Sequence, residues 1–377
     1  MPSLPVKVLQ IGMTRNHGGL ETYLLQQFRA IDRTKVIYDF VNITGEYDIV
    51  AQDEILASGS KVYAVNSRHL NPIKHYYQWI KLLAKVHSDY NAIVLNTNSL
   101  EYIFPLLVAV FFGIPKRVIH SHNMGYERKI GFYRRILIAF NKVLLKQSAT
   151  HYFACSKAAG KWMFGDKDFT VIHNAIQPRD FMHNGITRNF VRKKLGLQDC
   201  FVVGHVGRFS YQKNHKFLIQ IFSEIVKKQK NAMLMLIGNY VGDDFYWRQC
   251  HEIVNELQLS EKVLFLGERK DVPDLMQAMD CFVLPSHFEG LPLVGIEAQA
   301  AGLLCFFSVN ITKELAVTDL VHFLSFKQPA SHWAEQILYI FKTYKALSFR
   351  EHDFNTITEK GYNIEYEIKK IEKFYCK

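Results

Sequence analysis

The feature of this 377-residue chain that most constrains its fold is an alternation of short apolar runs with helical patterns, which occurs in both halves of the chain. Short runs rich in Val, Ile, Leu and Phe are typical of buried parallel strands, and the amphipathic segments between them are typical of helices that cover such a sheet. The strand candidates of the first half are Val6–Ile11, Tyr38–Ile43, Lys61–Val65, Ala92–Asn96, Arg117–His120, Tyr152–Cys155 and Thr170–His173. Those of the second half are Val202–Val206, Leu234–Ile237, Val263–Leu266, Cys281–Leu284 and Leu304–Phe307. The alternation predicts an α/β protein with two doubly wound sheets.

A polar stretch without strand patterns separates the two halves. It runs from residue 177 to residue 199 and carries Pro178 and Gly185, which are typical of a connecting segment. We therefore expect a Rossmann-like N-terminal domain over residues 1–176, a linker over 177–199 and a second Rossmann-like domain over 200–354. A charged amphipathic helix is expected near the end, within about residues 355–377.

Features of the whole chain predict a cytoplasmic protein. The longest apolar run, Ile103–Ile114, is interrupted by Pro105 and is well short of the roughly 20 residues that span a bilayer, so we expect a buried helix there. The first residues lack a basic leader, and the six cysteines contain no C-x-x-C pair. Both observations favour a reducing compartment without secretion.

The formal net charge of +11 is concentrated in one segment. Between Ile114 and Thr150, eight basic residues stand against the single acid Glu127. Its second half combines aromatic and aliphatic residues with cations at nearly helical spacing, as in a helix that lies on an anionic membrane surface. A core helix with a solvated basic face is the alternative, and both interpretations stay open. Nucleic acid ranks last, because no RNP, zinc-finger or helix-turn-helix signature accompanies the charge. The cations of the candidate membrane segment are Arg128, Lys129, Arg134, Arg135, Lys142 and Lys146.

The strongest local motif is a pair of glutamates eight positions apart. Glu289 follows a predicted buried strand, Gly290 and Pro292 indicate a loop, and Glu297 lies in the short helix that starts at Leu293. The start of a helix offers unpaired backbone N–H groups and a positive dipole to a phosphate, while nearby carboxylates can accept hydrogen bonds from sugar hydroxyls. This combination suits a nucleotide sugar.

Two cations follow the first strand of the second half. Arg208 and Lys213 lie between the strand Val202–Val206 and the helical segment Lys216–Lys228, so both can reach the carboxyl edge of the sheet. A guanidinium and an ammonium group there could hold a diphosphate and neutralise the charge that develops on it as it leaves. Solvated loop cations are the alternative, and the glutamates downstream favour the functional interpretation.

The motifs of the first half are weaker. Gly18 and Gly19 precede a helix and could let backbone N–H groups approach a phosphate, although a Gly-Gly pair also makes an ordinary turn. His120 and His122 come at the end of a strand, and we expect their rings to point to opposite sides, so that only one faces a ligand. A metal site is not expected, because two diverging ligands are too few and no D-x-D motif or carboxylate cluster follows.

In kind and order, these motifs resemble those of the retaining glycosyltransferases of family 4. The resemblance rests on the E-x7-E spacing of Glu289 and Glu297 and extends over nearly the whole chain. Its other segments are Gly18-Gly19, His120-Ser121-His122-Asn123, His173-Asn174-Ala175-Ile176 and Val206–Asn214. It implies the GT-B fold, in which an acceptor-binding and a nucleotide-sugar-binding domain face each other across a cleft and the last helix packs back on the first domain.

The resemblance also implies a role for each residue. Glu297 would accept hydrogen bonds from the ribose, and Glu289 from the donor sugar. His122, with His120 as second choice, would hydrogen-bond the donor sugar and its phosphate. The expected catalytic residues are His122, Arg208, Lys213 and Glu289. The expected donor-binding residues are Gly18, Gly19, Arg208, Lys213, Gly290, Leu291, Leu293, Val294 and Glu297.

The predicted activity is transfer of a sugar from a nucleotide sugar, and the expected donor is a UDP-sugar. The transfer is expected to retain the anomeric configuration and to need no metal or cofactor. The expected acceptor is a glycan or a lipid-linked oligosaccharide of exopolysaccharide or capsule synthesis, met in the cytoplasm or at the inner face of the membrane. A GT-B sugar-nucleotide 2-epimerase is one alternative, but it normally lacks the glutamate pair. A non-catalytic glycan-binding or complex subunit is another, but it has no chemical need of Arg208, Lys213, Glu289 and Glu297.

Overall fold

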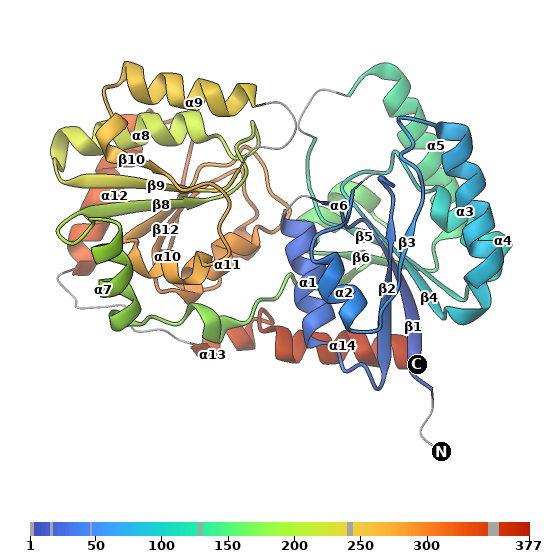
Figure 1. The fold of residues 1–377 in the computed structure, drawn as a ribbon. Helices are drawn as coiled ribbons and strands as arrows, with labels where there is room; N and C mark the ends of the chain where they lie inside the picture. Colours follow the sequence, from blue (N-terminus) through green and yellow to red (C-terminus); the bar gives the residue numbers. More distant parts are fainter. Residues whose placement is uncertain (1–3, 16–17, 46, 127–129, 240–243, 346–353) are drawn as a thin grey trace. The chain divides into compact units, whose positions relative to one another are not determined.

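The computed structural model describes residues 4–377 except 16–17, 46, 127–129, 240–243 and 346–353. The chain forms two compact units, which Figure 1 shows as a ribbon. Unit 1 comprises Met1–Ala175 with Asn363–Lys377, and unit 2 comprises Ile176–Tyr362. Each unit is built on a parallel sheet covered by helices, so the predicted pair of Rossmann-like α/β sheets is confirmed.

The sheet of unit 1 has seven parallel strands in the order β3-β2-β1-β4-β5-β6-β7. The strands are β1 (Val6–Ile11), β2 (Val36–Asn42), β3 (Val62–Ala64), β4 (Ala92–Thr97), β5 (Lys116–Ser121), β6 (His151–Ala154) and β7 (Thr170–Val171). After β1 the chain adds β2 and β3 on one side and then returns to add β4 on the other. The carboxyl ends of β1 and β4 therefore flank a topological switch point, the place where open α/β sheets bind ligands.

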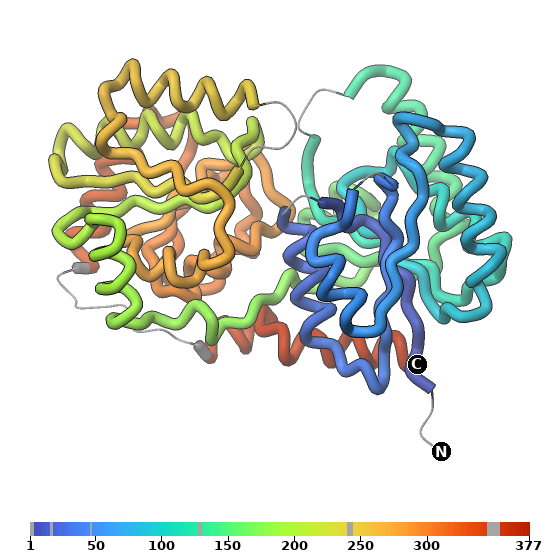
Figure 2. The backbone as a smooth tube through the Cα atoms, viewed as in Figure 1, coloured from blue at the N-terminus to red at the C-terminus, as the bar shows by residue number. Residues whose placement is uncertain are grey.

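Helices cover this sheet on both faces. They are α1 (Gly19–Ala30), α2 (Gln52–Ala57), α3 (Pro72–Val86), α4 (Phe104–Phe111), α5 (Phe132–Ser148), α6 (Lys157–Phe164) and α14 (Ile364–Cys376), with the 3-10 turn η1 (His87–Asp89). The last helix, α14, packs beside α1 and β2, and Figure 2 shows the red end of the chain next to its blue beginning. Lys116 Nζ donates to the carbonyl oxygens of Phe374 and Tyr375, both at 2.9 Å, and so caps the negative end of α14.

The sheet of unit 2 has six parallel strands in the order β10-β9-β8-β11-β12-β13. The strands are β8 (Phe201–Val206), β9 (Ala232–Ile237), β10 (Val263–Phe265), β11 (Cys281–Leu284), β12 (Leu304–Ser308) and β13 (Val321–Leu324). Here the order reverses between β8 and β11, which places the switch point of unit 2 at their carboxyl ends. The edge strand β13 was not predicted from the sequence.

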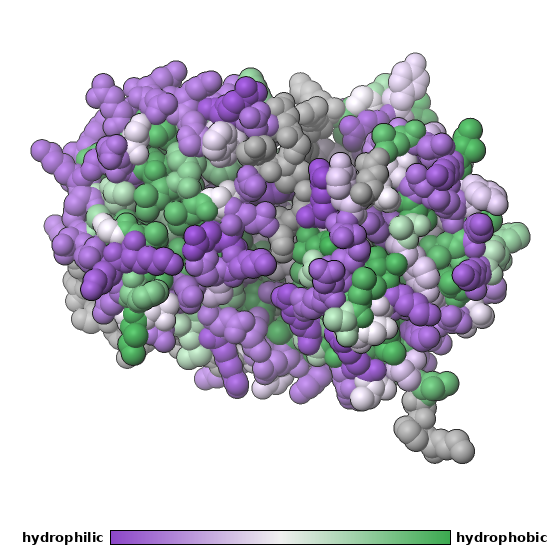
Figure 3. All heavy atoms as spheres, viewed as in Figure 1, coloured by the Kyte–Doolittle hydropathy of each residue, from purple (hydrophilic) through white to green (hydrophobic). Residues whose placement is uncertain are grey.

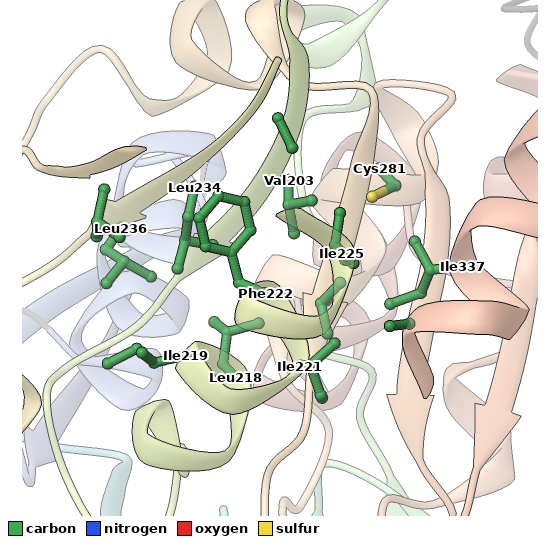
Figure 4. Packing of buried hydrophobic residues seen from close by; sticks show 14 of the residues in the cluster. Val203, Leu218, Ile219, Ile221, Phe222, Ile225, Leu234, Leu236, Cys281 and Ile337 are labelled. Carbon is green, nitrogen blue, oxygen red and sulfur yellow. The ribbon is translucent and has the colours of Figure 1, made fainter. Parts of the chain in front are cut away.

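The helices of unit 2 pack an apolar core against the sheet. They are α7 (Gly185–Lys194), α8 (His215–Lys228), α9 (Phe245–Glu256), α10 (Val272–Ala278), α11 (Leu293–Ala300), α12 (Ala330–Lys345) and α13 (Phe354–Glu359), with 3-10 turns η2 (Pro178–Phe181), η3 (Ser260–Lys262) and η4 (Lys313–Leu315). Figure 4 shows how α8 inserts Leu218, Phe222 and Ile225 against Val203 and Leu234 of the sheet. This packing fixes α8, and with it the loop that leads from β8 into α8.

The segment predicted as a linker, residues 177–199, contains η2 and α7 and belongs to unit 2. Arg188 and Arg192 on α7 attach it to the end of α10. Arg188 donates to Asp280 Oδ1 at 2.5 Å, and Arg192 donates to Asp280 Oδ2 at 3.2 Å and to the carbonyl oxygen of Ala278 at 2.8 Å. Buried, charge-assisted bonds of this kind hold α7 firmly on unit 2.

Candidate functional site

At the switch point of unit 2, the loops after β8 and β11 are hydrogen-bonded to each other. The backbone N–H of His287 donates to the carbonyl oxygen of Gln212 at 2.8 Å. Gln212 Nε2 donates to the carbonyl oxygen of Phe288 and to Glu289 Oε2, both at 3.1 Å. Gln212 is a site residue that the sequence reasoning missed. The only available signal was its position next to Lys213.

Lys213 and Glu289 form a nearly buried ion pair across the same two loops. Lys213 Nζ lies 2.7 Å from Glu289 Oε1, and the two side chains are 16% and 8% exposed. Water screens such a pair little, and removal of one partner would leave the other as an uncompensated charge. Two of the four predicted catalytic residues are therefore in direct contact.

Arg208 is the second cation of the loop after β8. It is half-buried and has no hydrogen bond or ion pair with the part of the chain that the structure describes. A Cβ on the preceding Gly207 would lie 3.0 Å from Lys213 Cε and 3.2 Å from His205 Nε2. Gly207 thus leaves the space through which the Lys213 side chain reaches Glu289.

The first turn of α11 faces the same loops. Its first residues, Leu293 and Val294, have backbone N–H groups without an acceptor among the described residues, as is usual in a first helical turn. Glu297 lies one turn further on and is 7% exposed. Burial raises the pKa of Glu297 to about 7, and the positive charge of Lys213 opposes the shift. Both protonation states of this carboxyl are therefore accessible near neutral pH.

The rest of the loop before α11 and the helix itself are fixed by packing. Gly290 and Leu291, also predicted to hold a phosphate, are buried. Gln299 of α11 was not singled out from the sequence, but its Nε2 donates to the carbonyl oxygens of Gly295 and Leu315, both at 2.8 Å. Its Oε1 accepts from the backbone N–H of Val317 at 3.0 Å. Gln299 thereby holds the loop after β12 against α11.

In unit 1, the predicted glycine pair stands at the start of α1. Gly18 is the N-cap residue and Gly19 the first helical residue. A Cβ on Gly18 would lie 2.8 Å from Glu21 Oε2, and Glu21 accepts a hydrogen bond from Thr14 Oγ1 at 2.6 Å. The first turn of α1 therefore carries its own acidic side chain, which favours a neutral ligand group over a phosphate there. Residues 16 and 17 of this loop lie outside the described residues.

His120 and His122 point to the same side, so the expectation of diverging rings is wrong. Their ring centroids are 4.0 Å apart. His120 lies in β5 and His122 just beyond it, and residues two positions apart along a strand share a face. His120 Nδ1 is 3.3 Å from the hydroxyl oxygen of Tyr23, and His122 Nε2 is 3.1 Å from Asn96 Oδ1. Burial lowers the pKa of both rings, that of His122 to about 3, so both are neutral near pH 7.

Two further kinds of feature are absent from the described residues. Within these residues, no three His, Cys, Asp or Glu side chains are grouped as metal ligands. In the same part of the chain, no helix has the length and apolar character to cross a bilayer.

Unit 1 exposes apolar and basic side chains on three neighbouring helices. α3, α4 and α5 pack side by side and contain no Asp or Glu. The exposed apolar residues are Ile73, Tyr77 and Ile80 on α3, Val110 and Phe111 on α4, and Phe132, Tyr133, Ile136, Leu137, Phe140 and Val143 on α5. Figure 3 shows hydrophobic surface over α3 and α4 near its right-hand edge. We call these residues the apolar face of unit 1.

The structure modifies both expectations for this region. The run Ile103–Ile114 was expected to be a buried helix, but Phe111 of α4 is 81% exposed. α5 buries only Asn141, Leu145 and Ser148, so it exposes apolar as well as basic residues. Of the cations counted in the segment, Arg134 donates to both carboxylate oxygens of Glu101, at 2.9 and 2.5 Å, which neutralises its charge. Arg128 and Lys129 lie outside the described residues.

Known proteins resemble this chain in sequence and in fold. The family model described as Glycosyl transferases group 1 matches residues 187–351. The putative glycosyltransferase EpsF of Bacillus subtilis (strain 168) is 31% identical over 384 residues, which cover 100% of this chain and 97% of EpsF. The UDP-Gal:alpha-D-GlcNAc-diphosphoundecaprenol alpha-1,3-galactosyltransferase of Escherichia coli is 23% identical over 379 residues, with 98% and 96% of the two chains covered.

A solved structure supports the same fold assignment. The crystal structure of Anabaena Alr3699/HepE in complex with UDP-glucose matches with a TM-score of 0.72 at 19% identity, over 98% of this chain and 95% of that one. At this identity the likeness concerns the fold alone, which is the predicted GT-B fold. Together, the comparisons favour glycosyl transfer over the 2-epimerase and over the non-catalytic subunit that the sequence had left as alternatives.

Proposed function

The chain belongs to the group 1 glycosyltransferases, and from this premise we propose that it transfers a sugar from a UDP-sugar to a lipid-linked acceptor of cell-surface polysaccharide synthesis. The name of the Escherichia coli relative describes a UDP-sugar donor and a diphosphoundecaprenol acceptor. The Anabaena protein of the same fold was crystallised with UDP-glucose. These names support the donor and acceptor classes.

The observation that carries the proposal is the arrangement at the switch point of unit 2. Arg208 and Lys213 come from one loop, and Glu289 and the start of α11 come from the other. We propose that the two cations and the first turn of α11 hold the diphosphate, so that no divalent ion is required. Glu297 would accept hydrogen bonds from the ribose hydroxyls, and Glu289 would accept them from the donor sugar.

The proposed chemistry is a substitution at the anomeric carbon with retention of configuration. The acceptor hydroxyl would attack from the face that the diphosphate leaves, and a phosphate oxygen of the leaving group would take the proton of that hydroxyl. Arg208 and Lys213 would stabilise the negative charge that grows on the diphosphate as the glycosidic bond breaks. The Lys213–Glu289 pair also fixes the lysine in advance, which reduces the reorganisation needed in the transition state.

We further propose that unit 1 docks on an anionic membrane through its apolar face. Apolar side chains that protrude among cations, on three helices that contain no Asp or Glu, suit the boundary between headgroups and acyl chains. Arg135 and Lys142 have no ion-pair partner among the described residues and could each contribute about 1 kcal/mol at such a surface. Docking would bring the enzyme to a lipid-linked acceptor.

The proposal is tested by a screen of nucleotide sugars followed by an assay of transfer. The thermal unfolding midpoint is measured with UDP-glucose, UDP-galactose, UDP-N-acetylglucosamine and the matching GDP and ADP sugars, because a ligand that binds only the native state raises it. We expect a rise with UDP and with at least one UDP-sugar. Transfer from that donor to a diphosphoundecaprenol-linked sugar should then give a product with the anomeric configuration of the donor, as read by proton NMR. A rise only with GDP or ADP sugars, or an inverted product, would overturn the proposal.

A further inference from the structure

At the switch point of unit 1, buried side chains form one hydrogen-bonded chain from α14 to His122. His122 Nε2 is 3.1 Å from Asn96 Oδ1, and Asn96 Nδ2 donates to Gln10 Oε1 at 3.0 Å. Gln10 in turn hydrogen-bonds the hydroxyl of Tyr375 on α14. Gln10, Asn96 and Tyr375 are only 2%, 4% and 4% exposed, so water does not compete for these bonds.

The carbonyl group of Ile11 sets the direction of these bonds. Asn96 Nδ2 also donates to the carbonyl oxygen of Ile11 at 3.0 Å. A carbonyl oxygen can only accept, so the NH2 end of the Asn96 amide must lie there, and its Oδ1 end must face His122. That amide oxygen can also only accept, which places a proton on Nε2 of His122. Because burial lowers the pKa of His122 to about 3, the ring carries this single proton near neutral pH.

The remaining nitrogen of His122 is therefore an acceptor. Nδ1 is buried, and it has no hydrogen-bond partner among the residues that the structure describes. A lone pair on Nδ1 can accept a hydrogen bond from a hydroxyl group, but it cannot donate one to a phosphate oxygen.

We propose that the chain Tyr375–Gln10–Asn96 holds His122 in the Nε2–H tautomer, and that His122 thereby recognises a sugar hydroxyl and not the diphosphate. Asn96, Gln10 and Tyr375 act as positioning residues, since each acts through another side chain. The identity of the ligand rests on the proposed function, whereas the tautomer does not. This narrows the role expected from the sequence, in which His122 contacts both the donor sugar and its phosphate.

The first experiment reads the tautomer directly. Long-range proton–nitrogen spectra of the full chain labelled with 15N-histidine are recorded at pH 7 without a ligand, and His122→Gln identifies the signals of His122. We expect a neutral ring with its proton on Nε2. A proton on Nδ1, or an imidazolium at pH 7, would overturn the inference. Since no substrate is present, this result is independent of the donor and of the reaction.

Variants along the chain test positioning. Asn96→Ala should give a mixture of the two tautomers at His122, and Gln10→Met and Tyr375→Phe should give smaller shifts in the same direction, because they act further from the ring. Asn141→Ala is the matched control, because Asn141 is also a buried asparagine of unit 1 but donates to the carbonyl oxygen of Leu100. Thermal unfolding shows which variants fold. Tyr375→Phe keeps the ring and removes one hydroxyl, so the test survives if Asn96→Ala does not fold. If every folded variant of Asn96, Gln10 and Tyr375 gave the wild-type spectrum of His122, these three residues would have no positioning role.

Binding and kinetics then test what His122 recognises. His122→Ala and Asn96→Ala should bind UDP within about twofold of the wild type, because no contact to the diphosphate is lost. The same variants should lower kcat/KM for the UDP-sugar by about tenfold or more. With a deoxy sugar substrate that lacks the recognised hydroxyl, His122→Ala should cause no further loss. A tenfold weaker Kd for UDP in His122→Ala would mean a phosphate contact and would contradict the proposal. Failure of the wild type to use any UDP-sugar would contradict the proposed function but not the tautomer.

Discussion

The switch points of the two units have the same topology and different chemistry. In unit 2 the loops after β8 and β11 bring together ionic groups, with Lys213 Nζ 2.7 Å from Glu289 Oε1 and a raised pKa at Glu297. In unit 1 the ends of β1, β4 and β5 bring together amides and two neutral imidazoles, with lowered pKa values at His120 and His122. The doubly wound sheet determines where a ligand can bind, and the side chains at its edge determine which kind of group is bound.

This difference separates two tasks of a sugar transfer. Charges at the switch point of unit 2 can stabilise a leaving diphosphate, whose charge increases during the reaction. Neutral, directional hydrogen bonds at the switch point of unit 1 can distinguish one hydroxyl arrangement from another, because an unmatched buried polar group loses its partner. Changes at unit 2 should therefore act mainly on rate, and changes at unit 1 mainly on the choice of sugar.

Removal of a cation from unit 2 should have the largest effect. Arg208→Ala and Lys213→Ala should each lower kcat/KM by about two to three orders of magnitude, since fixed positive charge at the leaving group is lost. Steady-state kinetics with the preferred UDP-sugar measure the change. Lys227→Ala is the control on α8, because Lys227 forms an exposed pair with Glu224 at 2.6 Å and should keep activity within about twofold.

Loss of Lys213 also leaves the nearly buried Glu289 without its cation, so folding must be separated from catalysis. The double variant Lys213→Ala/Glu289→Gln removes both charges and should recover stability but not activity. Arg208→Ala leaves no such unpaired acid among the described residues and should fold normally. Nearly normal kcat/KM in both single variants would show that the ionic site is not the reacting one.

The raised pKa of Glu297 gives the second prediction. Its folded-state pKa of about 7 lies above the reference value of 4.5, so the native state binds a proton that unfolding releases. Native stability should therefore fall as pH rises from about 4.5 to about 7, and the loss should be complete above that window. Glu297→Gln should raise the free energy of unfolding at pH 8 by up to about 3 kcal/mol, and hardly at all at pH 4. Denaturant unfolding of both proteins at the two pH values measures this.

The same glutamate should link UDP binding to proton release. The ionised carboxylate is the better acceptor of hydrogen bonds from the ribose hydroxyls, so UDP should bind more tightly at pH 8 than at pH 6. Titration calorimetry near pH 6.5, in buffers of different ionisation enthalpy, should detect the proton that UDP binding releases. Glu297→Gln should weaken UDP binding and abolish the proton release. If the difference in stability between Glu297→Gln and the wild type is the same at pH 4 and pH 8, and the variant binds UDP as the wild type does, Glu297 is not part of the site.

The sequence predicted most of the sheets because their strands are continuous apolar runs. β1 and β11 have the bounds predicted from the sequence, whereas the edge strand β13 was missed because its sequence, Val-His-Phe-Leu, is short and only half-buried. The sequence also shows where a strand ends, and Lys213 and Glu289 were predicted as site residues because both follow the carboxyl end of a predicted strand. The ion pair between Lys213 and Glu289 could not be predicted from the sequence, because it depends on how two loops that are distant in sequence pack against each other. The amide contacts of Gln212, Gln299 and Asn96 likewise depend on tertiary structure, since an amide carries no sequence signature.

The apolar face extends the comparison to the surfaces and gives the third prediction. Two double variants, Phe132→Ser/Phe140→Ser and Arg135→Glu/Lys142→Glu, test this face. Each should reduce binding of the full chain to vesicles with anionic lipid by at least about tenfold. The control is Lys227→Glu/Lys228→Glu in unit 2, where both lysines form exposed ion pairs. Vesicle sedimentation should also show weaker binding at high salt, because exposed charges are screened over about 8 Å at physiological ionic strength. Equal recovery with neutral and anionic vesicles would leave unit 1 without a membrane role.

The smallest expected effect is that of metal removal, and it tests the ionic character of unit 2 most directly. Arg208, Lys213 and the N–H groups at the start of α11 would supply the positive charge that a divalent ion supplies in other transferases. Excess EDTA should therefore change kcat/KM by less than about twofold, and added Mg²⁺ or Mn²⁺ should not raise it. In Arg208→Ala, by contrast, a divalent ion could replace part of the lost charge, so stimulation by Mg²⁺ in this variant alone would sharpen the assignment. Loss of wild-type activity in EDTA, restored by Mg²⁺ or Mn²⁺, would mean that the protein cations do not neutralise the diphosphate, and the contrast between the two switch points would no longer explain the reaction.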